Sequence, residues 1–149
     1  MPSSTINRGD DHDSIFYLFA ARGSLRYGEL MEEEGRRTND PASADALFRH
    51  AIDYMRAAIN VCELFDNTYH ATDDPKSFFD GGDADMLEYL EEFRSIGLMA
   101  YAAIQRCHAE RSSIGNRIMA LGKPYYQFNE ESNVKYTALL SKTSKPTAF

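Results

Sequence analysis

Residues 44–65 read ADALFRHAIDYMRAAINVCELF, and this stretch decides the fold class. Its apolar and small residues recur every three or four positions for about six turns, which is the spacing of one α-helical face. The members of this face are Ala44, Leu47, Phe48, Ala51, Tyr54, Met55, Ala58, Ile59, Cys62 and Phe65. Three further residues, Ile52, Val61 and Leu64, widen the face, so we expect this helix to contact neighbours on two sides within a bundle.

A first helix is predicted on the N-terminal side of this stretch. It is expected to begin at Ser14, where the Asp13 carboxylate can accept hydrogen bonds from the first free amides, and to end near Gly35. The pair Asp40 and Pro41 then provides a cap and a first helical residue for the central helix.

Further helices are predicted after the central one. Residues 66–83 carry Asn, Asp, Pro and a Gly pair and are expected to form a loop, whose two phenylalanines either fold back or contact a partner. The elements expected after it are a helix from Asp85 to about Arg111, a short helix over 114–121, an aromatic linker at Tyr125, Tyr126 and Phe128, and a last helix over 130–142 capped by Asn129.

The fold class expected from this pattern is all-α, because no segment alternates apolar and polar residues as a strand does. With 149 residues, of which 43% are hydrophobic, the chain can build one substantial core. We therefore predict a single helical domain over residues 1–149, a bundle or hairpin array of four to five helices with a repeat-like helix pair at its centre. Residues 1–12 and 143–149 are expected to be flexible tails.

The net charge of −7 is divided unevenly along the chain. Residues 1–110 hold 10 basic and 21 acidic residues, a net of −11, whereas residues 111–149 hold 6 basic and 2 acidic residues, a net of +4. The acidic part would repel phosphates, which argues against general nucleic-acid binding. The basic part can neutralise the chain's own acidic part or bind an acidic partner.

The compartment is expected to be intracellular, either cytoplasmic or nuclear. No apolar run approaches the ~20 residues of a membrane helix and no secretory leader is visible, so no membrane association is expected. Cys62 and Cys107 fall on apolar helix faces and are predicted to be free thiols, with a disulfide between two helices as the alternative.

Two places in the chain resemble the tetratricopeptide-repeat pattern. Gly28 and Gly35 have the spacing of the two glycines in the repeat's first helix, and Ala51 and Ala58 stand where its second helix carries small residues. A second partial match is formed by Phe93, Ile96, Gly97 and Ala100. Over residues 21–124 the chain thus resembles a degenerate tetratricopeptide-like or microtubule-interacting-and-transport-like helical hairpin, which implies a protein-binding role.

A second similarity is to the C-terminal homology domain of the scaffold proteins of the super elongation complex. It rests on Ala51, Tyr54 and Ala57-Ala58 in one helix, followed late in the chain by Lys135-Tyr136. The domain of that family self-associates in the nucleus, so this similarity implies self-association.

No metal or cofactor site is predicted. The four histidines, His12, His50, His70 and His108, lack a second histidine at i+3 or i+4, and no Glu-x-x-His occurs. A zinc cluster of Cys62, Cys107, His50 and His108 is conceivable, but zinc sites usually contain closely spaced ligand pairs, so a buried, hydrogen-bonded histidine is expected instead. The acids of residues 80–88 lack the glycine of a calcium loop and favour a turn followed by a cap.

No catalytic residues are predicted either, because nothing combines a nucleophile, a base and an oxyanion donor. We therefore expect a non-enzymatic scaffold or adaptor domain that binds a partner helix or a second copy of itself, forming a homo-oligomer. The residues predicted for the binding groove are Tyr54, Met55, Ile59, Phe93, Met99 and Tyr101, with core packing as the alternative for each. The alternative functions are a structural subunit of a larger assembly such as a virion, and a small-ligand or metal-binding bundle.

Overall fold

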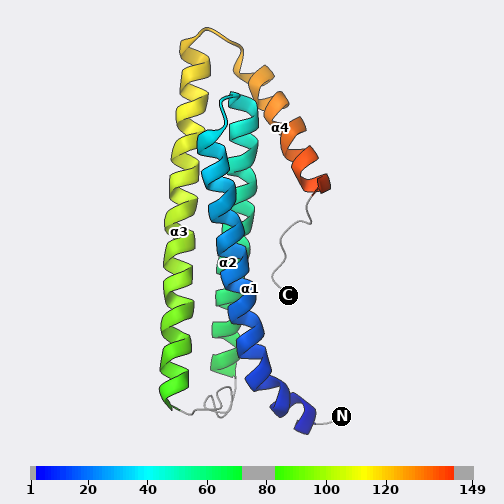
Figure 1. Cartoon of the computed structure of the whole chain (residues 1–149), viewed down its shortest axis with the longest axis vertical. Coiled ribbons are helices and arrows are strands. Elements are labelled where there is room, and N and C mark those ends of the chain that lie inside the picture. The colour runs from blue at the N-terminus through cyan, green and yellow to red at the C-terminus, as the bar shows by residue number, and fades with distance from the viewer. Residues whose placement is uncertain (1–2, 72–82, 143–149) are drawn as a thin grey trace.

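The computed structural model describes the backbone of residues 3–71 and 83–142 and the side chains of residues 15–67 and 87–142. Four helices account for nearly all of these residues, and no strand occurs among them: α1 (Ser3–Arg37), α2 (Pro41–Ala71), α3 (Asp83–Ala120) and α4 (Tyr125–Lys142). The all-α prediction is confirmed. Figure 1 shows three long helices side by side, with the shorter α4 lying along one end.

The helix α2 lies at the centre and contacts each of the other three helices. A first cluster of buried side chains joins α1, α2 and α3, and includes Leu18, Leu25, Met55, Val61, Phe65, Phe93 and Ile96. A second cluster joins α2, α3 and α4, and includes Phe48, Ile52, Cys107, Ile114, Ile118 and Phe128. The wide apolar face of residues 44–65 therefore has neighbours on more than one side, as its composition predicts.

Two glycines let α1 approach α2 closely. A Cβ atom at Gly28 would lie 2.7 Å from Cε of Met55, and one at Gly35 would lie 2.9 Å from Cζ of Phe48. On the facing side of α2, Ala51 and Ala58 are fully buried. Small residues on both helices thus allow the two backbones to approach closely.

The helix ends follow local chemistry. The carboxylate of Asp40 accepts hydrogen bonds from the backbone N–H of Ser43 at 2.9 Å and from its hydroxyl at 2.6 Å, which lowers the pKa of Asp40 and caps α2 at Pro41. At the end of α3, Gly122 has a φ of 74° and donates its N–H to the Met119 carbonyl, while Lys123 donates to that of Ile118. This is a Schellman turn, which glycine permits at low cost.

Several predicted boundaries are wrong. α1 begins at Ser3 rather than Ser14, so Asp13 lies inside the helix instead of capping it. α2 continues through residues 66–71, where a loop was expected; the rest of that loop, with Phe78 and Phe79, lies outside the described residues.

The second half of the chain also differs from the prediction. α3 runs unbroken to Ala120, so the expected end near Arg111 and the separate short helix over 114–121 do not occur. The expected aromatic linker is the first turn of α4, which begins at Tyr125 rather than after Asn129. Ile114, Ile118 and Phe128 are buried, and their packing outweighs the weak helix propensity of the serines and glycine near residue 113.

None of the helices, within the residues searched, is long and apolar enough to cross a membrane.

Candidate interaction surfaces

Two of the six residues predicted for the binding groove lie in the core. The side chain of Met55 is fully buried beneath Gly28, and Phe93 is 5% exposed and stacks on Phe65 with 4.0 Å between ring centroids. For Met55 the prediction of a surface role is wrong and the alternative, core packing, is correct, whereas Phe93 packs in the core and also lines a groove between α2 and α3. A sequence pattern identifies the apolar face of a helix but does not say which part of it a neighbour covers.

The other four residues lie at three separate places. Tyr54 is half-buried, with its ring stacked on Tyr27 of α1 at a centroid distance of 5.5 Å and near the ring of His50 at 4.9 Å. Ile59 is half-buried and lines a groove on α2. Met99 and Tyr101 are exposed on α3, by 45% and 62% of their surface. The structure therefore does not bring the predicted set together into one groove.

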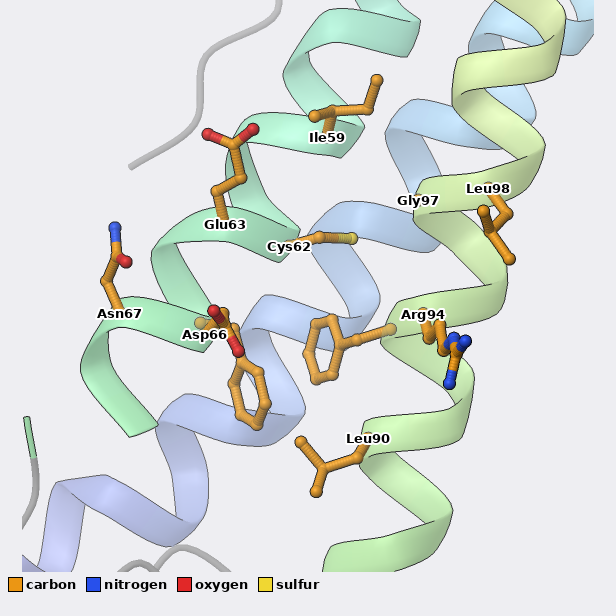
Figure 2. A pocket seen from close by; sticks show the side chains of 11 residues that line it. Ile59, Cys62, Glu63, Asp66, Asn67, Leu90, Arg94, Gly97 and Leu98 are labelled. Atoms are coloured by element: carbon orange, nitrogen blue, oxygen red, sulfur yellow. The ribbon is translucent and has the colours of Figure 1, made fainter. Parts of the chain in front are cut away.

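An open apolar groove does lie between the second half of α2 and the first half of α3. Its volume is about 650 Å³, and α1 passes behind it (Figure 2). The residues that line it are Ile59, Cys62, Glu63, Phe65, Asp66 and Asn67 of α2, and Leu90, Phe93, Arg94, Gly97 and Leu98 of α3. We call this hollow the α2/α3 groove.

The floor of the α2/α3 groove is formed by buried, closely packed aromatic side chains. Phe65 is 1% exposed, stacks on Phe93, and meets the edge of the Tyr17 ring at a centroid distance of 6.1 Å. Cys62 and Leu90 project into the space between the helices (Figure 2). Burial, followed by the nearby charge of Glu63, raises the pKa of the Cys62 thiol to about 11, so at neutral pH it is an uncharged apolar group rather than a thiolate.

A buried ion-pair network ties α1 to α3. The Glu32 carboxylate is 3% exposed and accepts hydrogen bonds from Nε and Nη2 of Arg106 at 2.8 and 3.0 Å and from Nη2 of Arg36 at 2.6 Å. Arg36 also donates from Nε to Glu110 at 3.0 Å. Burial by itself would raise the pKa of Glu32, but the two guanidinium groups outweigh it and hold the pKa below the ordinary value of 4.5.

We expect this network to make stability pH-dependent in acid. Because the folded-state pKa of Glu32 is depressed, its stabilising contribution is present above about pH 4.5 and is lost as the pH falls through the lower folded-state value. Urea unfolding followed by circular dichroism at pH values from 6 down to about 3 will measure it. The Glu32→Gln variant should be less stable than the wild type at pH 6, with the difference shrinking in acid. A constant difference would contradict this assignment.

A second buried carboxylate joins α2, α3 and α4. Asp45 is 1% exposed and accepts a hydrogen bond from Nε of Arg111 on α3 at 2.9 Å. Its other oxygen accepts a hydrogen bond from the hydroxyl of Ser132 on α4, which is fully buried. The sequence pattern did not reveal either buried acid, although Asp45 stands among small and apolar residues on the central face.

Polar and aromatic contacts hold the later part of α4 to α2. Tyr136 donates its hydroxyl proton to Asp53, and the Arg49 guanidinium lies 4.2 Å above the Tyr136 ring. His50 is fully buried nearby, with Nδ1 3.6 Å from the Asp53 carboxylate. Burial, followed by the hydrogen bond to Asp53, raises the pKa of Tyr136 to about 12, so this phenol keeps its proton at physiological pH.

The zinc cluster considered from the sequence does not form. Cys62 packs against the first buried cluster and Cys107 belongs to the second, while His108 is exposed. Among the described side chains, no group of three or more His, Cys, Asp or Glu residues could hold a metal ion. Both cysteines are free thiols, and burial raises the pKa of Cys107 to about 12.

Comparison with known proteins adds no relative: no family model, no curated protein and no solved structure matches the chain. The similarities to tetratricopeptide-like hairpins and to the super elongation complex scaffolds therefore remain predictions.

Proposed function

We propose that this chain is a non-enzymatic protein–protein interaction domain that acts inside the cell and associates with a second copy of itself through the outer surface of α3. The observation that supports this proposal is the apolar character of that surface. Leu98 is 65% exposed and Met99 is 45% exposed, in the middle of a long regular helix. Adjacent exposed apolar side chains of this kind are typical of interaction sites.

Small residues accompany these two side chains. Ser95, Ala102 and Ala109 are all exposed and follow one another at intervals of seven residues, which keeps them on nearly the same line of the helix. We call the surface formed by Ser95, Leu98, Met99, Ala102 and Ala109 the outer α3 face. Small residues on a helix surface allow the backbone of a second helix to approach closely.

Two α3 helices, one from each copy of the chain, would bury the outer α3 face if they packed in antiparallel orientation. If Leu98 of one copy lies opposite Met99 of the other, Ser95 lies opposite Ala102. The apolar residues then meet at the centre, with small residues on both sides of them. A two-fold axis repeats each contact, as in most homodimers.

The Ala102→Arg variant tests this proposal. Ala102 is exposed, so a long cation there leaves the monomer intact but holds a second helix away. Sedimentation velocity over a range of concentrations should show reversible dimers for the wild type and monomers for Ala102→Arg. The matched control is Val134→Arg, which places the same charge on an exposed apolar residue of α4 and should still dimerise.

Other results would point elsewhere. A wild-type chain that remains monomeric at high concentration contradicts self-association. Particles larger than dimers that dissolve as salt is added would support the alternative function, a structural subunit of a larger assembly held by the uneven charge of the chain. Dimers that Ala102→Arg does not affect would place the interface on another surface.

A further inference from the structure

We propose that the α2/α3 groove is a second binding site, which shares Leu98 with the outer α3 face, and that it receives a basic amphipathic helix of a partner protein. Three features of the chain favour this occupant: the register of α2 against α3, an open glycine in the groove, and the charge around it.

The register shows that the groove is the continuation of a seam that α4 covers at its other end. The hydrogen bond between Asp45 and Arg111 sets an antiparallel register of α2 against α3, which at intervals of seven residues places Ile59 opposite Gly97 and Asp66 opposite Leu90. The first pair is fixed by a hydrogen bond and lies under Ser132 of α4. The last two pairs line the open groove. One end of the seam therefore already carries a helix, and none of the described residues covers the other end.

α4 leaves the seam because its later contacts are with α2. Phe128 and Ser132 lie near both α2 and α3, whereas Tyr136 bonds to Asp53 of α2. In Figure 1, α4 slants away from α3 toward its C-terminal end. The uncovered part of the seam spans about eight residues of each helix, or roughly 12 Å, which fits two to three turns of an added helix.

Gly97 provides space for such a helix. A Cβ atom at this position would meet no heavy atom within 4 Å. At Gly28 and Gly35, by contrast, a Cβ atom would lie within 3 Å of Met55 and Phe48, respectively. Glycine destabilises a helix interior relative to alanine, and the packing of this chain does not require it at residue 97. A partner helix lying across Gly97 would approach the α3 backbone closely, because no side chain stands between them at that position. Gly23 of α1 is equally open but does not line the groove.

The charge around the groove selects a basic partner. Glu63 and Asp66 lie along its α2 side, and Glu88 and Glu91 line an adjoining hollow on α3. Arg94 is the only cation among the described residues that line the groove. Lysines or arginines flanking an apolar stripe would complement this rim, whereas flanking acids would be repelled. The net charge of −7 also attracts a basic partner over longer distances.

The test uses two synthetic helical peptides of about 20 residues with the same leucines at i, i+4 and i+7. One peptide carries lysines beside the leucine stripe and the other carries glutamates. Binding to the full chain is measured by fluorescence anisotropy of a labelled peptide. The lysine peptide should bind about tenfold or more tightly than the glutamate peptide, with the difference falling in about 0.5 M salt.

Variants of the chain locate the binding. Gly97→Leu fills the groove and should weaken binding of the lysine peptide about tenfold or more, whereas Gly23→Leu, the same substitution in an open helix, should not. Circular dichroism of both variants establishes that they are folded. The Ala102→Arg variant should bind the peptide as the wild type does, so failure of self-association and failure of this proposal are distinguishable.

Two outcomes would overturn the proposal. Equal binding of the two peptides, or binding that Gly97→Leu leaves unchanged, would remove the basic helix as the occupant. Loss of wild-type dimers in Gly97→Leu, with dimers retained in Ala102→Arg, would make a second copy of this chain the occupant instead.

Discussion

Replacing Asp45 with alanine is expected to lower the free energy of unfolding by about 3 kcal/mol, because it leaves a guanidinium group facing a site built for a carboxylate. Asp45 is almost completely buried and accepts hydrogen bonds from Arg111 and Ser132, so its loss weakens contacts of α2 with both α3 and α4. The Arg111 side chain is 31% exposed, so water will partly solvate its charge when Asp45 is removed. The loss of unfolding free energy is therefore expected at the lower end of the range for broken buried ion pairs.

Urea unfolding followed by circular dichroism will measure this change. The control is Glu34→Ala, which removes an exposed pair with Arg37 and should change stability by less than about 0.5 kcal/mol. The double variant Asp45→Ala with Arg111→Met should be more stable than Asp45→Ala alone, because it removes the uncompensated cation. Equal effects of Asp45→Ala and Glu34→Ala would show that the buried carboxylate is not important for stability.

Replacing Phe65 with alanine is expected to cost about 4 kcal/mol, the usual range for a buried phenylalanine. Phe65 is 1% exposed and joins all three long helices, since its ring stacks on Phe93 of α3 and meets the edge of Tyr17 of α1. A domain of this size has a stability of roughly 5–15 kcal/mol, so the variant should be close to unfolding at 37 °C.

The thermal midpoint of Phe65→Ala, followed by circular dichroism, checks this expectation. The matched control is Phe16→Ala: Phe16 is 60% exposed on α1, and its loss should shift the midpoint little. A Phe65→Leu variant should fall between the wild type and Phe65→Ala, because it retains part of the buried volume. If Phe65→Ala and Phe16→Ala were equally stable, the first buried cluster would not be the core of the fold.

The central helix and its cap could be predicted from the sequence because both depend on local signals. The three-four spacing of residues 44–65 is sustained for many turns, and Asp40 before Pro41 specifies a helix start through groups only three residues apart. The glycine and proline at residues 122 and 124 likewise end α3 through contacts within one turn.

The predictions failed where distant residues decide the structure. The third long helix was expected to end near Arg111, but Tyr125 of α4 packs so closely on Gly115 that a Cβ atom there would lie 3.1 Å from its ring, and the neighbouring Ile114 and Ile118 are buried. Met55 was placed on a surface because the spacing of apolar residues does not reveal the pairing of helices. The α2/α3 groove depends on that pairing, and only two of its members, Ile59 and Phe93, were among the predicted residues.

The unequal attachment of α4 has a consequence for motion. Phe128 and Ser132 are its only buried residues among those described, and its later contacts with α2 combine the hydrogen bond of Tyr136 with half-buried side chains such as Leu139. The three long helices, by contrast, share a continuous apolar core that includes Phe65 and Phe93. Opening of α4 therefore needs less free energy than global unfolding, and exchange of its amide hydrogens is set by this local event. Because Ser132 bonds to Asp45, each opening of α4 also exposes one end of the seam between α2 and α3. A partner that binds at that end would shift the equilibrium of α4 from the docked position toward the released one.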